Sequence, residues 1–214
     1  LSHPLEGTVI YYTLDGTDPD ENSLVYAEPI VLQHTTPIRA IALQDGRWSR
    51  IVDAEFHLID AKRAVKLEHP YSNQYEAGGL KALIDHQRGG DNFRTGVWQG
   101  YHGVDLVATV DLGTKMKVNR LAGSFLQEAG AWIFMPKEVE FFVSNDGKQF
   151  RSVGKVKNDI PEDEDGAFIQ ELGVRPRCEA RYVKMAAKAI GTCPEWHVGA
   201  GQPAWIFCDE FVIE

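Results

Sequence analysis

The sequence predicts an all-β fold that consists of a small sandwich followed by a larger jelly roll. Short runs of β-branched and aromatic residues recur along all 214 residues, separated by Gly, Pro, Asn and Asp. Helical periodicity is confined to one short segment, Leu80 to Ile84, where Leu80, Leu83 and Ile84 share a face. A hydrophobic content of 43% is ordinary for a globular protein and sufficient for a core. This combination is typical of sandwiches and barrels.

Residues 1–60 predict a small sandwich of the immunoglobulin or fibronectin type. Its expected strands are residues 9–14, 29–32, 37–43 and 51–58. The cluster Asp15 to Pro19 predicts a turn after the first strand, and Asp45-Gly46 predicts a hairpin turn. Four to six strands in about sixty residues fit such a sandwich.

Residues 61–214 predict a jelly roll. Its expected strands are residues 105–112, 117–126, 137–144, 151–157, 181–189 and 204–214. Alternation in the third of these places Val139, Phe141 and Val143 on one face, which we expect to be buried. The Asn145 to Gly147 segment then predicts a tight turn. A strand set of this length suits an eight-stranded jelly roll.

The charge of the chain excludes some classes of partner. The formal net charge is −9, which argues against binding to nucleic acid or anionic membranes through a basic surface. The apolar runs are too short for a bilayer crossing, so no membrane insertion is expected. Because the chain starts at Leu1 rather than Met, we interpret it as a piece of a longer polypeptide, and a missing signal peptide says nothing about compartment.

Three cysteines, Cys178, Cys193 and Cys208, leave at least one thiol unpaired. Their spacing contains no Cys-x-x-Cys pair, which disfavours a zinc knuckle or a redox pair. Three reduced thiols are the favoured interpretation, and a Cys193–Cys208 bridge is the alternative.

The first unit resembles the small C-terminal sandwich domain of chitobiases and β-hexosaminidases. The resemblance rests on Ile10 to Pro19, on Tyr26-x-x-Pro29-Ile30 and on Ile38 to Ala40. Its Tyr-Thr-x-Asp-Gly-x-x-Pro core has a physical logic, since a strand there runs into a turn fixed by Asp15, Gly16 and Pro19.

The second unit resembles the discoidin domain, also called the coagulation factor 5/8 type C domain. Bacterial glycan-binding versions of this galactose-binding-like fold form family 32 of the carbohydrate-binding modules. Six blocks occur in the family's order: residues 83–85, Trp98, residues 110–113, 143–150, 180–183 and 209–211.

The order of the two units is similar to the tail of a family 20 β-N-acetylhexosaminidase from a Bacteroidetes bacterium, and residues 124–127 and 193–197 add to this likeness. The resemblance implies an N-terminal catalytic domain in the same polypeptide. It also implies a secreted, periplasmic or outer-surface location in a Gram-negative cell and a role in carbohydrate metabolism.

We expect no catalysis within these residues. Family 20 hydrolysis resembles substrate-assisted catalysis with an adjacent Asp-Glu pair. The Asp20-Glu21 pair and residues 162–165 lie in polar turns, without apolar walls that would shift a pKa. Asp209 and Glu210 lie in the last strand, so alternation predicts that their side chains point to opposite faces. No Gly-x-Ser-x-Gly elbow is present.

The resemblance implies one structural Ca²⁺ between an early loop and the final strand. Asp85 would supply a carboxylate, the loop of residues 88–92 with Asp91 would supply oxygens, and Glu210 would add a second carboxylate. The sequence departs from the family at His86, where a Gly is common, and at Gly89-Gly90, which lengthens the loop. The alternative is that Asp85 caps a turn and Glu210 pairs with an arginine.

A glycan site needs an aromatic ring for the apolar face of a sugar and polar side chains for its hydroxyls. Three loops hold this mixture: residues 91–101, 127–136 and 191–205. The candidate sugar-binding residues are Trp132, Trp196, His197, Gln127, Glu128, Arg94 and Phe134. For each aromatic the alternative is packing, which we favour for Trp98 and Trp205. The resemblance implies a terminal galactose or an N-acetylhexosamine as ligand.

These observations favour a non-catalytic ancillary region whose discoidin domain targets an enzyme to glycans. One alternative is that both units only pack on the catalytic barrel. Another is a discoidin module that binds protein or lipid, although the acidic charge disfavours anionic lipid.

Overall fold

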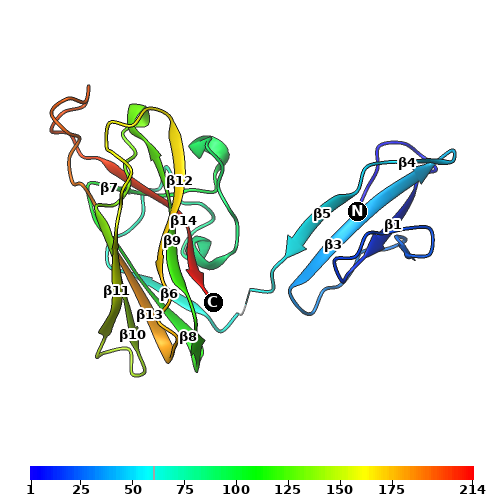
Figure 1. Cartoon of the computed structure of the whole chain (residues 1–214), viewed down its shortest axis with the longest axis horizontal. Helices are drawn as coiled ribbons and strands as arrows, with labels where there is room; N and C mark the ends of the chain where they lie inside the picture. Colours follow the sequence, from blue (N-terminus) through cyan, green and yellow to red (C-terminus); the bar gives the residue numbers. More distant parts are fainter. Residues whose placement is uncertain (60) are drawn as a thin grey trace. The chain divides into compact units, whose positions relative to one another are not determined.

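A computed structural model describes residues 1–59 and 61–214, which form two compact units. One unit is Leu1–Ile59, and the described part of the other is residues 61–214 (Figure 1). The described residues contain strands and three short 3₁₀ helices but no α-helix, so the all-β prediction is confirmed. None of the helices within 1–59 and 61–214 has the length and apolar character needed to cross a membrane.

The first unit is an antiparallel sheet in the order β2-β1-β3-β4, with β5 also paired to β3. Its strands are β1 (Val9–Thr13), β2 (Leu24–Val25), β3 (Thr36–Gln44), β4 (Arg47–Trp48) and β5 (Val52–Phe56). These strands form one layer, without the second facing layer of a sandwich among residues 1–59. The expected strand at residues 29–32 is absent: Pro29 has no N–H for a ladder, and Val31 is 84% exposed.

The Asp45-Gly46 hairpin is confirmed. Gln44 pairs with Arg47 across a two-residue turn. Both turn residues have positive φ, 49° at Asp45 and 72° at Gly46, as the right-handed twist of a hairpin requires.

The second unit is a two-layer jelly roll, as predicted. One sheet has the order β11-β10-β13-β8-β6 and the other has the order β12-β9-β14-β7. The first sheet consists of β6 (Ala64–Leu67), β8 (Leu106–Val118), β10 (Glu138–Ser144), β11 (Arg151–Lys157) and β13 (Cys178–Lys188). The second consists of β7 (Gln99–His102), β9 (Leu121–Glu128), β12 (Ala167–Val174) and β14 (Trp205–Ile213). The 3₁₀ helices are η1 (Ala82–Ile84), η2 (Phe93–Thr95) and η3 (Ala129–Ala131).

The core of the second unit lies between these sheets. Val139, Phe141 and Val143 are at most 3% exposed, which confirms the predicted buried face of β10. Phe141 meets Phe211 of the opposite sheet with ring centroids 6.1 Å apart. The three cysteines are free thiols, so the bridge alternative is not realised.

Some boundaries differ from the prediction. β8 continues past Leu112 to Val118, because Gly113 takes a φ of 79° and donates its N–H to Asp111 Oδ1 at 2.8 Å. The strand expected at residues 117–126 therefore begins only at Leu121. β7 and β12 were not predicted.

Strand register places several loops at one end of the jelly roll, here called the loop end. Glu138 at the start of β10 pairs with Lys157 at the end of β11 and with Lys188 at the end of β13. The loops around η3 and residues 189–204 therefore share an end, opposite the β10–β11 turn (Figure 1).

Candidate functional site

The second unit contains a hollow of ≈ 480 Å³ between the loop that precedes η1 and the segment around η2. We call it the Tyr75 hollow. Its lining combines aromatic rings with amide, carboxylate and guanidinium groups: Asn73, Gln74, Tyr75, Glu76, Ala77, Gly78, Phe93, Arg94, Gly96 and Trp98.

Buried polar groups of β7 hold one wall of this hollow. Gln99 Nε2 donates to the carbonyl oxygens of Glu76 at 3.1 Å and of Gly79 at 2.9 Å. The Tyr101 hydroxyl donates to Gln99 Oε1 at 2.6 Å. Burial raises the pKa of Tyr101, which keeps the hydroxyl a neutral donor. The loop backbone at residues 76–79 is thereby fixed to the sheet.

The Tyr75 ring is fixed by close packing over a glycine. A Cβ at Gly100 would lie 2.9 Å from Tyr75 Cβ and 2.7 Å from Phe207 Cε1, so only glycine lets these residues meet. The Tyr75 ring centroid lies 4.6 Å from that of Phe207 and 5.3 Å from that of Trp205. The ring therefore forms a rigid wall with little rotamer freedom to lose on binding.

Arg94 supplies positive charge from the η2 segment of the lining. The Asn92 side chain caps η2 by accepting a hydrogen bond from Arg94 N at 3.1 Å. Arg94 Cζ lies 4.2 Å from the centroid of the Phe93 ring. Within the described part of the chain, no acceptor bonds the guanidinium group, so its N–H donors can serve a ligand.

The predicted aromatic residues of the loop end do come together. His197 lies edge-on to Trp132, Phe134 and Trp196, with ring centroids 5.9, 5.6 and 5.5 Å away. The main chain joins this cluster to Trp205, whose N–H donates to the Trp132 carbonyl oxygen at 2.9 Å. Through Trp205 the cluster is connected to Tyr75.

His197 was predicted to bind sugar, and the structure corrects this. The side chain is 7% exposed, and Nδ1 accepts a hydrogen bond from Gly199 N at 3.0 Å. Nδ1 therefore has no proton, and Nε2 donates to the Ala129 carbonyl oxygen at 2.8 Å. Both ring nitrogens are therefore hydrogen-bonded within the protein. The imidazole joins two loops, and neither nitrogen is free to bind a ligand.

Gln127 and Phe134 need the same correction, because both are buried. Gln127 Nε2 donates to the Pro161 carbonyl oxygen at 2.7 Å, and its Oε1 faces Met135 N at 3.4 Å. Phe134 is 1% exposed. These side chains fix the loops and do not reach solvent.

The other predicted residues of the loop end are more accessible. Trp132, with a φ of 67°, packs against Gly199, where a Cβ would lie 2.6 Å from Trp132 Cζ2. Glu128 is half-buried just before η3. Trp196 is 53% exposed, so it is the one predicted aromatic that presents most of its ring to solvent.

Two of the three residues predicted to bind calcium are close to each other: Asp85, whose Oδ1 accepts a hydrogen bond from Gln87 N at 2.9 Å, adds to the effect of burial in raising the pKa of Glu210. Asp91 is exposed, whereas Glu210 is 3% exposed and accepts a hydrogen bond from His86 N at 2.9 Å. Among residues 1–59 and 61–214, no group of three His, Cys, Asp or Glu side chains is placed to hold a metal. The donor chemistry also differs, because the loop turns N–H groups toward the carboxylate, whereas Ca²⁺ requires oxygens.

Asp209 and Glu210 do not point apart as alternation predicted. A register shift between Cys208 and Glu210 interrupts the pairing of β14 with β9. Asp209 Oδ2 consequently accepts a hydrogen bond from Gly89 N at 2.7 Å. Gly89 lies in the same loop as His86, whose N–H donates to Glu210 Oε2. Burial raises the pKa of Glu210 to about 8, an effect that neighbouring Asp85 increases and Arg88 opposes.

Family comparisons agree with this architecture. The sequence model described as "F5/8 type C domain" matches residues 67–206, and that described as "Fn3 associated" matches residues 1–56. The chain belongs to the F5/8 type C domain family. No curated protein sequence matches this F5/8 type C chain significantly.

Solved structures similar to the F5/8 type C domain include carbohydrate-binding modules. The module CpGH89CBM32-5 of Clostridium perfringens, in complex with GalNAc-β-1,3-galactose, has 19% identity and a TM-score of 0.44, covering 71% of this chain and 94% of that one. The family 32 module of C. perfringens NanJ, in complex with galactose, has 15% identity and a TM-score of 0.41, covering 72% and 93%. The C-terminal domain of a Bacteroides fragilis chitobiase has 19% identity and a TM-score of 0.39, covering 71% and 93%.

Sequence reasoning missed most of the hollow in this F5/8 type C domain. It found Arg94 from the composition of its loop, but it passed over Tyr75, Glu76 and Asn73. Polar residues flank Tyr75, and nothing local distinguishes the segment from a solvated loop. A strand glycine often marks close approach of another residue, but the strand that contains Gly100 was itself not predicted, so this signal could not be used.

Proposed function

We propose that the F5/8 type C domain binds a glycan in the Tyr75 hollow. The observation behind this proposal is that one concave site offers a fixed aromatic ring, free guanidinium donors and a carboxylate. A pyranose presents an apolar C–H face and a rim of hydroxyls, which these three kinds of group complement. The ring would stack on the sugar, Arg94 would donate to its hydroxyl oxygens, and Glu76 would accept from its hydroxyl groups.

We further propose the biological setting that the sequence resemblance implies. The chain would be a non-catalytic, C-terminal ancillary region of a secreted β-N-acetylhexosaminidase at the periplasm or outer surface of a Gram-negative cell. Weak sugar binding would raise the effective concentration of the enzyme at its substrate. The ligand class is a terminal galactose or N-acetylhexosamine.

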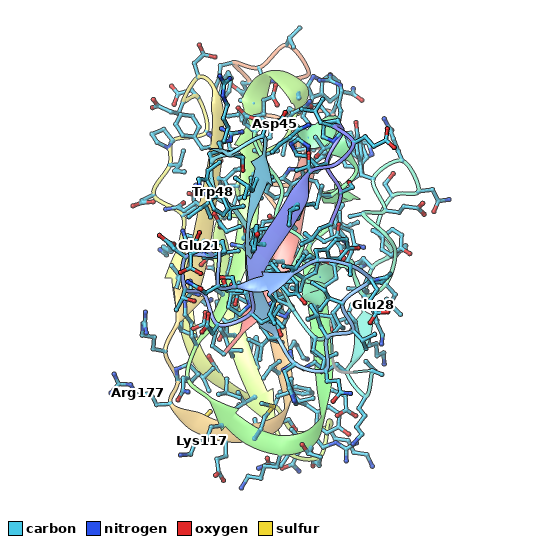
Figure 2. The ribbon with its side chains drawn as sticks, turned by 90° about the vertical axis from the view of Figure 1, so that its right-hand side faces the viewer. Glu21, Glu28, Asp45, Trp48, Lys117 and Arg177 are labelled. Atoms are coloured by element: carbon cyan, nitrogen blue, oxygen red, sulfur yellow. The ribbon has the colours of Figure 1, made fainter. Side chains whose placement is uncertain are left out.

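The test is a titration of the chain with galactose, N-acetylgalactosamine and N-acetylglucosamine, in which binding is measured by calorimetry or NMR. The informative variants are Arg94→Ala and Glu76→Gln, because both side chains are exposed and their loss should leave the fold intact. Each should weaken binding at least about tenfold, since a charge-assisted hydrogen bond contributes roughly 1.5–3 kcal/mol. Arg177→Ala is the matched control: Arg177 is an exposed arginine between β12 and β13 (Figure 2).

A separate variant, Trp196→Ala, distinguishes the hollow from the exposed tryptophan of the loop end. If it abolishes binding while Arg94→Ala does not, the glycan site lies on the 192–203 loop and the hollow assignment is wrong. If no sugar binds at millimolar concentration, the glycan proposal itself fails.

A second candidate function concerns the first unit, which we propose packs on a neighbouring domain of the same polypeptide. Its single sheet leaves large apolar side chains open, including Trp48 at 44%, Phe56 at 49% and Val52 at 55% exposure (Trp48 is labelled in Figure 2). A hollow of ≈ 270 Å³ lies beside Ile10 and Ala40. Exposed apolar side chains gathered on one small unit favour an interaction site. Hydrogen exchange of β1 and β3 should slow in the longer polypeptide, and unchanged exchange would refute docking.

A further inference from the structure

The loop of residues 85–90 meets the last strand at two buried carboxylates. Asp209 is 1% exposed and Glu210 is 3% exposed. Two carboxyl groups at this depth need partners, because burying a polar or charged group without one is costly.

Backbone amides of the loop are some of these partners. His86 has a φ of 64°, a left-handed conformation uncommon for a residue with a side chain, and its N–H donates to Glu210 Oε2 at 2.9 Å. Gly89 N donates to Asp209 Oδ2 at 2.7 Å. The loop thus presents donors to both carboxylates, which is the polarity of an anion-binding turn.

The Trp98 side chain holds the loop in this orientation. Its Nε1 donates to the Gly90 carbonyl oxygen at 2.9 Å, so that oxygen already has a partner inside the protein. A Cβ at Gly89 would lie 2.2 Å from Trp98 Cε2, so the loop rests directly on the indole ring.

Arg88 supplies the full positive charge. Its Nη1 lies 3.9 Å from Asp209 Oδ1, the oxygen of that carboxylate for which no hydrogen-bond donor is found in the described part of the chain. Its Nη2 pairs with Glu171 on β12, and Glu171 also pairs with Arg120. The guanidinium group therefore connects the loop to two strands of one sheet, β14 and β12, through a planar fork suited to two carboxylates.

We propose that Arg88 takes the place of a divalent cation at this junction, so that the F5/8 type C domain of this chain closes its 85–90 loop on the last strand without a bound metal. The proposal does not depend on the glycan site. It explains why the loop supplies N–H groups and a guanidinium where a calcium site would supply oxygens.

The first measurement is the metal content of the purified chain after dialysis against metal-free buffer, together with its melting temperature in excess EDTA and in millimolar CaCl₂. We expect far less than one metal ion per chain and the same melting temperature in both buffers. One equivalent of retained calcium, or a lower melting temperature in EDTA, would overturn the proposal. This measurement needs no variant, so it stands even if a substituted chain fails to fold.

The second measurement is the melting temperature of Arg88→Gln, with Arg177→Gln as the matched control. Loss of the guanidinium should lower the melting temperature by roughly 2–4 °C, because Asp209 stays buried without its charged neighbour. The control should melt like the parent chain. Adding Asp209→Asn to Arg88→Gln should restore part of the loss, since the buried charge is then gone. An Arg88→Gln chain as stable as its parent would contradict the role given to Arg88.

Discussion

Replacing Glu210 with glutamine should stabilise the protein at neutral and alkaline pH. Burial raises the pKa of Glu210 to about 8 from a usual 4.5. The folded state therefore holds this proton more tightly than the unfolded state, so stability is greatest below pH 4.5 and falls as pH rises from 4.5 to 8. The cost is about 3 kcal/mol at pH 7 and approaches roughly 5 kcal/mol above pH 8, at 1.36 kcal/mol per pKa unit. Glutamine is neutral and keeps an oxygen for His86 N–H, so Glu210→Gln removes this cost.

The assay is urea denaturation of both chains at intervals from pH 5 to pH 9. The difference in unfolding free energy should be small at pH 5, grow with pH and level off above pH 8. Glu179→Gln is the control: Glu179 is exposed, and Lys115 lowers its pKa, so its substitution should not reproduce this trend. A Glu210→Gln chain less stable than its parent at pH 8 would refute the reasoning, because it would mean that the carboxylate neutralises a cation there.

Two further substitutions test the contacts that hold the loop of residues 85–90 and the loop of residues 76–79 in place. Gly89→Ala should destabilise the second unit by several kcal/mol and change tryptophan fluorescence, because the added Cβ would lie 2.2 Å from the Trp98 ring; an unchanged melting temperature would contradict the packing. Tyr101→Phe should cost about 1–3 kcal/mol in urea denaturation and speed hydrogen exchange at residues 76–79, since Gln99 Oε1 loses its buried donor; unaltered exchange would show that Gln99 does not depend on Tyr101.

The sequence predicted those parts of the fold that local chemistry determines. Alternation identified the buried face of β10, and Asp45-Gly46 identified a hairpin because its positive φ angles suit few other residue pairs. The boundaries of β11 were also correct, since turn residues flank a short strand. In contrast, β7 contains Gly100 and the buried polar side chain of Gln99, and it has no strand-like pattern.

The candidate site was predicted less well because long-range contacts determine its residues. His197 resembles a ligand-binding residue in sequence, but its role depends on the Ala129 carbonyl oxygen, 68 residues away in the chain. Tyr75 becomes a rigid wall only because Phe207 and Gly100 meet it across the sheet. Local composition identifies loops rich in aromatic and polar residues, yet it does not show which side chains turn inward.

The Asp209-Glu210 step shows how one irregularity links the fold to the chemistry of the loop. On a regular strand one carboxylate would face the core and the other the opposite side, and each would need its own partner. The register shift after Cys208 instead lets both acids reach the loop of residues 85–90, so one loop must satisfy two buried carboxyl groups. Two backbone amides and one guanidinium do so, with the His86 N–H placed by a left-handed φ. A chain with the bulge but without Arg88 would leave Asp209 Oδ1 without its cationic neighbour, and this is the loss that Arg88→Gln measures.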